Sequence, residues 1–199
     1  MMESTVVYFE KGGQENTATT LQLARERIIA LGVKKLVMAS TTGATAAAAM
    51  EYFNDLPVQL IVVPHQHDFR KVNAFPPDLV KTLRAAGHEI HFGTMLFHTD
   101  KLYGSDIPIV MANLLRCFSQ GVKVCFEIVL MATDAGLLAS GEKVIAIAGT
   151  ARGADTALVM QAASSRRLTG LRVNEILCKP LNPLNIEEIR EKTAGEQPQ

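Results

Sequence analysis

The chain has 199 residues, 48% of them hydrophobic, and its 20 basic and 20 acidic side chains give a formal net charge of zero. This length fits one fairly large domain or one domain with an appendage, and the hydrophobic fraction supports a substantial core and argues against global disorder. A neutral chain has no general electrostatic attraction for nucleic acid or for an anionic membrane, so neither is expected as a partner.

No part of the sequence has the pattern of a membrane or export segment. No apolar run is long enough to cross a bilayer, and the first residues lack the basic and then apolar pattern of a signal peptide. The three cysteines, Cys117, Cys125 and Cys178, are widely spaced and odd in number, which is typical of reduced, mostly buried thiols. We therefore expect a cytoplasmic protein.

In the first half of the chain, short apolar segments alternate with segments of helical periodicity. The sequence predicts strands over residues 5–9, 36–39, 58–63 and 89–92. It predicts helices over about 17–31, 45–53 and 77–86. Gly32 and Gly87 follow two of these helices, as glycine often does at a helix C-terminus. The intervening segments 64–77 and 93–106 are predicted to be irregular, and the second could be mobile.

The second half continues the alternation. A helix is predicted over about 107–119, and four apolar side chains share one of its faces: Val110, Met111, Leu114 and Phe118. The apolar segment 122–136 is predicted to start as a strand and to become a helix after Glu127. Further strands are predicted over residues 143–148, 157–163 and 171–180.

The order of these elements predicts the architecture. Strands that alternate with helices favour a layered α/β fold with a largely parallel sheet. We expect a single domain over residues 1–182 and a polar, loosely held C-terminal tail over residues 183–199. Ligands bind such sheets outside the carboxyl ends of the strands, so the loops at those ends are the first candidates for a site.

The loop after the predicted strand 36–39 is rich in hydroxyl groups and leads into a helix. The first amides of a helix are unpaired, and the helix dipole places partial positive charge there, so phosphate is a common ligand. Gly43 would allow a close backbone approach, and the hydroxyls of Ser40, Thr41, Thr42 and Thr45 would add donors. The alternative is that these side chains only cap the helix. The loop matches neither of the usual glycine-rich nucleotide-binding fingerprints.

The loop over residues 148–156 also follows an apolar strand. Gly149 and Gly153 flank Arg152, whose guanidinium suits bidentate contacts with phosphate or carboxylate. Asp155 and Thr156 supply further polar groups. The alternative is a glycine-rich turn with a solvated arginine.

Three other places could contribute to a site. Glu127 lies in an apolar run, where a carboxylate needs a partner or a raised pKa; it could accept from a ligand or simply start a helix. His65 and His67 would share a face of an extended segment, but no third metal ligand is apparent, and a loop that touches ligand or solvent is the simpler interpretation. The segment 15–17 opens a helix and is a candidate for the ligand crevice.

Several segments resemble a known family. "ALGVKKLVMASTTGATA" resembles the part of the pyruvate kinase C-terminal domain in which a Thr/Ser/Gly loop holds a sugar phosphate effector, and "VIAIAGTARGADTALV" resembles a later glycine-rich loop of that domain. A closer resemblance is to small stand-alone α/β proteins of archaea and bacteria that are similar to this domain. It rests on "VYFEKGGQENTATTLQLA", "GVKVCFEIVLMATDAG", "IAGTARGADTALV" and "EILCKP".

The resemblance implies a three-layer α/β/α fold of the pyruvate kinase C-terminal type. It also implies flavin mononucleotide (FMN) as the ligand, with its phosphate at residues 40–46 and its ribityl chain or ring near Glu127, Arg152 and residues 153–156. The expected cofactor-binding residues are Ser40, Thr41, Thr42, Gly43, Ala44, Thr45, Ala46, Glu127, Gly149, Thr150, Arg152, Gly153, Ala154, Asp155 and Thr156.

Two functions therefore lead. The first is an FMN-binding protein that could act as an oxidoreductase, without a metal. The second is a non-catalytic sensor of a phosphorylated metabolite that uses the same loops. A third hypothesis is a structural subunit whose loops are ordinary caps. A small phosphorylated ligand is the expected partner in the first two. Whether the protein forms a homo-oligomer is left open by the sequence. Because the catalytic barrel of pyruvate kinase is missing, we expect no pyruvate kinase activity.

Overall fold

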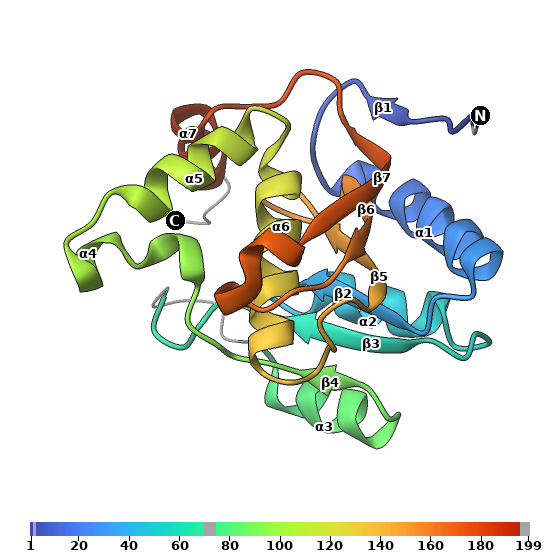
Figure 1. The fold of residues 1–199 in the computed structure, drawn as a ribbon. Coiled ribbons are helices and arrows are strands. Elements are labelled where there is room, and N and C mark those ends of the chain that lie inside the picture. Colours follow the sequence, from blue (N-terminus) through green and yellow to red (C-terminus); the bar gives the residue numbers. More distant parts are fainter. Residues whose placement is uncertain (2, 70–74, 196–199) are drawn as a thin grey trace.

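The computed structural model describes residues 1, 3–69 and 75–195, and the side chains of residues 193–195 are not among those described. Its sheet has seven strands in the order β1-β7-β6-β5-β2-β3-β4 (Figure 1). The strands are β1 (Val7–Phe9), β2 (Lys35–Ala39), β3 (Gln59–Val63), β4 (Glu89–Ile90), β5 (Lys143–Ala148), β6 (Thr156–Gln161) and β7 (Arg172–Pro180). The α-helices are α1 (Thr17–Leu31), α2 (Ala44–Tyr52), α3 (Pro77–Ala85), α4 (Asp100–Tyr103), α5 (Ile107–Arg116), α6 (Gln120–Asp134) and α7 (Ile186–Gly195).

The sheet is mostly parallel, as predicted. Strand β6 is antiparallel to both of its neighbours, β5 and β7, and the other four pairs are parallel. The exception has a local cause: only seven residues connect β5 to β6, and a parallel crossover needs a dozen or more. The chain must therefore turn back beside itself at this point.

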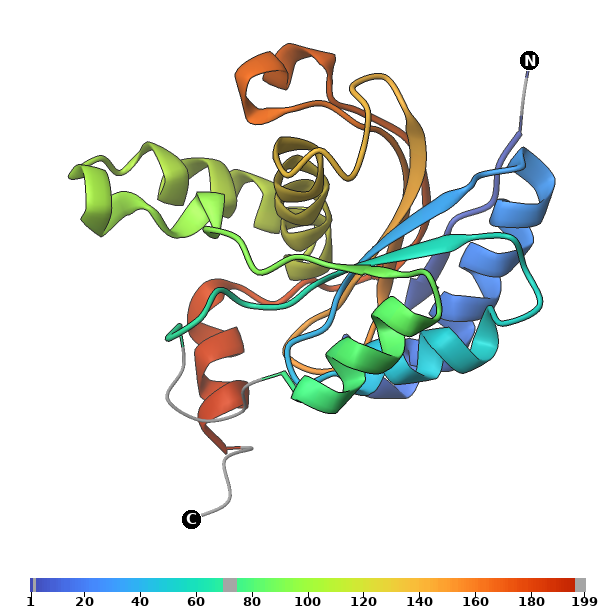
Figure 2. The same ribbon diagram turned by 90° about the horizontal axis from the view of Figure 1, so that it is seen from below.

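Helices cover both faces of the sheet, which confirms the three-layer α/β/α fold. Helices α1, α2 and α3 lie on one face, and α5 and α6 lie on the other (Figure 2). Strand β2 has the matching pattern, because Leu36 and Met38 belong to the core beneath α1 and α2 while Val37 belongs to the core beneath α6. A strand that is buried on both faces is expected to be apolar throughout.

The segment 122–136 is not a strand followed by a helix; that prediction is wrong. One continuous helix, α6, runs from Gln120 to Asp134. The Ser119 hydroxyl accepts a hydrogen bond from the amide of Val122 (3.0 Å) and so caps the helix. The misreading arose because α6 buries most of its length, and in a continuous apolar run periodicity cannot distinguish a buried strand from a buried helix.

The segment after residue 182 contains structure that was not predicted for a loose tail. Helix α7 begins with a reciprocal cap, in which the amide of Glu188 donates to Asn185 Oδ1 (2.9 Å) and the amide of Asn185 donates to Glu188 Oε2 (2.7 Å). Ile189 is buried, and Lys192 Nζ donates to the carbonyl of Gly12 (2.8 Å). The predicted tail therefore includes a helix that packs on the domain, and residues 196–199 lie outside the described residues.

The segment 93–106, predicted to be irregular, holds a short 3₁₀ helix (Leu96–His98) and α4.

Among the described residues, no helix has the combination of length and apolar character that crossing a bilayer requires.

Candidate functional site

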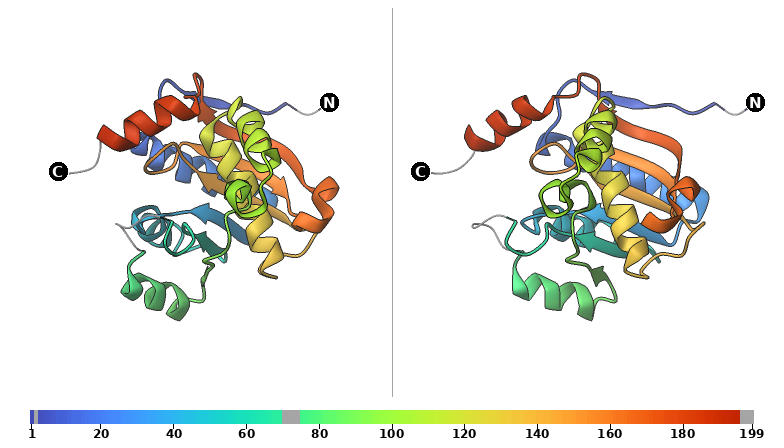
Figure 3. Two further views of the ribbon diagram at one scale, coloured as in Figure 1. Left: turned by 90° about the vertical axis from the view of Figure 1, so that its left-hand side faces the viewer. Right: turned by 60° about the vertical axis from the view of Figure 1, so that its left-hand side comes forward.

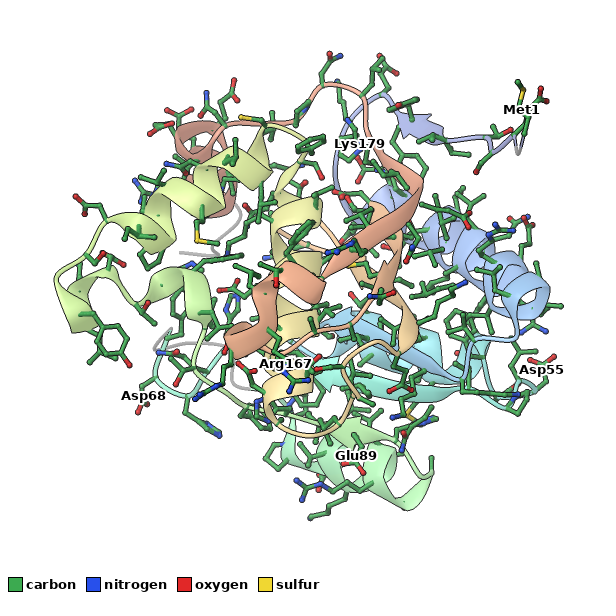
Figure 4. The ribbon with its side chains drawn as sticks, in the orientation of Figure 1. Met1, Asp55, Asp68, Glu89, Arg167 and Lys179 are labelled. Atoms are coloured by element: carbon green, nitrogen blue, oxygen red, sulfur yellow. The ribbon has the colours of Figure 1, made fainter. Side chains whose placement is uncertain are left out.

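The two predicted loops emerge at the same edge of the sheet. Strands β2 and β5 are parallel neighbours, so their carboxyl ends, Ala39 and Ala148, lead into residues 40–43 and 149–155 side by side. Asp55 precedes β3 and marks the amino edge in Figure 4, whereas Asp68 follows β3 and lies on the opposite side of the molecule. The loops share the side of Asp68, where ligands bind in parallel α/β sheets.

Residues 40–46 cap a helix and also leave donors open. The buried Ser40 hydroxyl accepts from the amide of Ala46 (3.2 Å), which is a capping role. No side chain or carbonyl of the described residues accepts from the amides of Ala44 and Thr45. Thr42 and Ala44 are exposed, and Thr41 is partly exposed. The capping interpretation therefore holds for Ser40. The amides of exposed Ala44 and buried Thr45 have no acceptor among the described residues, as is usual in the first turn of a helix.

Gly43 is required by packing within the chain. Its φ of 88° lies in the left-handed region, where other residues are strained. A Cβ atom at this position would lie 2.6 Å from Leu79 Cδ2 and 3.1 Å from Pro76 Cδ. The glycine thus lets the start of α3 approach the loop, and substitution of Gly43 would perturb folding as well as any ligand.

The carboxylate of the second loop, Asp155, accepts hydrogen bonds from its own chain neighbours. Asp155 is completely buried; its Oδ2 accepts from the amide of Thr150 (2.8 Å) and its Oδ1 from the hydroxyl of Thr156 (2.8 Å). Burial raises the pKa of Asp155, while the hydrogen bonds from Thr156, Thr150 and the amide of Gly13 act in the opposite direction. Asp155 and Thr156 therefore hold the loop together from inside.

The glycines of this loop serve its close packing on the start of α1. A Cβ on Gly149 would lie 2.4 Å from the carbonyl oxygen of Gly153, and a Cβ on Gly153 would lie 2.4 Å from Gln14 Cα. The amide of Ala154, which is buried, donates to the Thr17 hydroxyl (3.0 Å). These contacts leave Arg152 exposed at the tip of the loop.

A cavity of about 320 Å³ lies beside this tip. Its lining residues are Gly13, Gln14, Glu15, Thr150, Arg152 and Lys192. Two cations and one carboxylate thus come together from the β1–α1 connection, the β5–β6 loop and α7. Glu15, from the 15–17 segment that is a candidate for the ligand crevice, lines this cavity. Lys192 was missed, because a lysine in a polar C-terminal segment gives no sequence signal. Of the residues that the structure describes, none from 40–46 lines this cavity.

A larger cavity, about 620 Å³, opens at the amino edge. Its lining includes Lys34, Phe53, Pro57 and His88. This edge carries neither predicted loop. We place the candidate site at the carboxyl edge, because the open helix N-terminus and Arg152 both lie there.

Glu127 is buried away from solvent with partners of its own. Its Oε2 lies 2.5 Å from Lys123 Nζ, and its Oε1 accepts from the amide of Phe97 (2.8 Å). Burial favours a raised pKa, but the hydrogen bond from His98 and the charge of Lys123 outweigh it and lower the pKa of Glu127 to about 2. Burial lowers the pKa of Lys123, and Glu127 opposes that shift. The carboxylate is engaged within the protein, and partly exposed His98 is the only one of these side chains near the surface.

The two histidines after β3 lie on different aromatic partners. The ring of His65 meets Phe69 edge to face at 4.8 Å, and the ring of His67 stacks on Phe92 at 4.6 Å. Within the described part of the chain, no three His, Cys, Asp or Glu side chains come together as a metal site would require. Cys125 and Cys178 are buried free thiols, whereas Cys117 is exposed.

The family of the chain follows from a comparison of its sequence. The family model described as "Pyruvate kinase, alpha/beta domain" matches residues 18–160, which include both loops. The chain belongs to this family. A solved structure of Cryptosporidium parvum pyruvate kinase in complex with ADP is 17% identical over 73% of this chain and 23% of that chain, with a TM-score of 0.40. A second structure of the C. parvum enzyme is 16% identical over 73% of this chain and 22% of that chain, also with a TM-score of 0.40.

A third solved structure, an SAH-bound methyltransferase from Podospora anserina, is 13% identical over 69% of this chain and 63% of that chain, with a TM-score of 0.26. The chain spans under a quarter of the length of the two pyruvate kinases.

Proposed function

We propose that this protein binds FMN at the carboxyl edge of the sheet, with the phosphate at the N-terminus of α2. The observation that carries the proposal is the open amides of Ala44 and Thr45 beside the exposed Thr42. A helix N-terminus with a free hydroxyl supplies hydrogen bonds and partial positive charge to a phosphate.

The rest of the ligand would extend toward Arg152. This residue and Lys192 bring two cations to a cavity next to the second loop, and such cations suit the polar ribityl chain or the carbonyl oxygens of the flavin ring. The bound flavin would supply redox chemistry, and an oxidoreductase activity is therefore part of the proposal. The buried groups Glu127, Asp155 and Thr156 act as supports for the fold in this arrangement, and do not touch the ligand.

The phosphate position can be tested with one pair of variants. Thr42→Asp places a carboxylate where the phosphate would bind, and a negative charge at a helix N-terminus does not destabilise the fold. Thr42→Asn has nearly the same shape without the charge. We expect Thr42→Asp to weaken FMN binding by at least about tenfold, or ~1.4 kcal/mol, in a fluorescence titration, while Thr42→Asn binds close to the wild type.

Riboflavin is the matched ligand control, because it lacks only the phosphate. The wild type should bind riboflavin more weakly than FMN, and Thr42→Asp should not change riboflavin binding. Equal affinity of the wild type for both flavins would overturn the phosphate position at α2.

A sensor of another phosphorylated metabolite is the second candidate. The observation that favours it is the modest cavity of about 320 Å³ beside Arg152 and Lys192, which lies at the small end of ligand pockets. A thermal-shift panel distinguishes the two functions, since a ligand that binds the native state raises the melting temperature. A sugar phosphate that stabilises the protein when FMN does not would favour the sensor.

A further inference from the structure

Helices α4 and α5 and the turn after α5 carry several large apolar side chains that are exposed. Helices α4 and α5 form an arm that extends from the body of the domain (Figures 1 and 2) and that comes forward in Figure 3. Each of these apolar residues has between 37% and 73% of its surface exposed to solvent. We call them the α4–α5 apolar face: Leu102, Tyr103, Ile107, Ile109, Val110, Leu114 and Phe118.

Helix α5 has two apolar sides, and the domain uses only one. Ala112 is buried and Leu115 packs beside it on the core beneath α6. The other side of α5 carries Ile107, Val110 and Leu114 at spacings of three and four residues, which place them on one stripe of the helix. Phe118 follows in the turn after α5. A helix that is apolar nearly all round is normally buried on all sides, so the exposed stripe is the unusual feature.

The one charged side chain of α5, that of Arg116, is directed to other partners and does not cover the stripe. Arg116 is the only charged residue of α5. Its Nε donates to Gln120 Oε1 (2.8 Å) and one of its terminal nitrogens donates to Asn113 Oδ1 (2.7 Å). The guanidinium is thus held between Asn113 of α5 and Gln120, the first residue of α6.

The size of the face suits one half of a protein interface. Aromatic side chains bury roughly 150–250 Å² each and aliphatic ones somewhat less, so seven residues exposed to this degree present on the order of 700 Å². The largest apolar patch of a typical monomer is about 300–600 Å². A stable protein interface buries about 800 Å² on each partner.

We propose that the α4–α5 apolar face is a homodimer interface, in which α5 of one copy packs antiparallel against α5 of a second copy around a two-fold axis near Val110 and Leu114. A two-fold contact brings the same patch together with itself, and a stripe without charge does this without like-charge repulsion. The chain as a whole has a formal net charge of zero, so two copies also do not repel each other at long range.

The charges around the arm argue against a lipid surface. Amphipathic helices that lie on membranes carry an excess of Lys and Arg on their polar face. Between residues 100 and 118, Lys101 and Arg116 are balanced by Asp100 and Asp106. A second copy therefore fits the face better than an anionic membrane does. The proposal is independent of the ligand at the carboxyl edge.

The oligomeric state of the full chain tests the interface. We expect sedimentation equilibrium at micromolar concentrations to give twice the mass of one chain. The double variant Val110→Glu/Leu114→Glu should be a folded monomer, with a dimer dissociation constant raised by at least ~100-fold, because four carboxylates would be buried without partners. Ile29→Glu is the matched control, since Ile29 on α1 is 60% exposed and lies outside the face; it should remain dimeric.

The exposed thiol gives a second readout without any substitution. Cys117 lies at the end of α5, whereas Cys125 and Cys178 are buried, so a spin label should attach at Cys117 alone. The proposed dimer predicts a single, narrow intermolecular distance. A wild-type monomer at high micromolar concentration, a dimer that survives the double substitution, or binding of the monomeric wild type to lipid vesicles would overturn the proposal.

Discussion

The two loops at the carboxyl edge have similar sequences but different uses for their polar groups. Each follows a buried strand and combines glycine with hydroxyl side chains. In residues 149–155, the carboxylate of Asp155 accepts from the amide of Thr150, and Arg152 is the one polar side chain that is exposed. In residues 40–46, Ser40 satisfies one amide of α2 and others stay open. The two loops therefore differ in how many donors the fold leaves without partners, and this difference is why we propose the 40–46 loop as the phosphate site.

Of the changes that test this difference between the loops, substitution of Asp155 should have the largest effect, and that effect is on stability. Asp155→Ala leaves the amide of Thr150 and the hydroxyl of Thr156 buried without their acceptor. We expect the free energy of unfolding to fall by about 3 kcal/mol or more, because each buried group costs roughly 1–3 kcal/mol when its partner is lost. Urea unfolding measures the change. Asp155→Asn keeps one acceptor and should lose much less; equal losses for the two variants would contradict the assigned hydrogen bonds.

Substitution of Arg152 is expected to have a smaller effect, and this effect is on FMN affinity. Arg152→Ala removes the exposed cation at the tip of the loop. We expect FMN affinity to fall by about 1.5–3 kcal/mol, the range for hydrogen bonds to charged groups. The free energy of unfolding should fall by much less than in Asp155→Ala, because Arg152 is exposed. Calorimetric titration with FMN and urea unfolding of the same sample separate the two effects. Unchanged FMN affinity would show that the second loop contributes no ligand contact.

The smallest effect is a pH dependence of stability. Burial raises the pKa of Asp155 in the native state, so between its unfolded pKa of about 3.9 and the raised native value the native state binds more protons than the unfolded state. The free energy of unfolding should therefore decrease as pH rises through this window. Asp155→Asn has no proton to lose, and its profile should be flatter there. Parallel profiles of wild type and variant would contradict the raised pKa.

The sequence predicted those parts of the fold that depend on local patterns. Strand β5 and the main helix α1, ended by Gly32 in the left-handed conformation, have the predicted bounds within a residue. Helix α6 was misread at its N-terminal half, because its burial removes the polar side from which helical periodicity is read. The opposite charges of Lys123 and Glu127, four residues apart, were a helical signal in that segment.

The candidate site was predictable only in part. The two loops follow from the pattern of strand, glycine and hydroxyl, and their shared edge follows from a parallel sheet. Which polar groups have partners depends on contacts between distant segments, such as Gly153 with Gln14 and Lys192 with Gly12. No local pattern encodes those contacts. The same limit applies to the predicted apolar face of residues 107–119. Met111 packs on the core, whereas Val110, Leu114 and Phe118 are exposed, and only the tertiary structure shows this division.

The most direct test of the proposed function is the visible absorbance spectrum of the purified protein, recorded before and after FMN is added and the excess removed by desalting. We expect flavin absorbance to stay with the protein, with one FMN per chain at saturation. A protein that is colourless as purified and that retains no added FMN would contradict the proposed function.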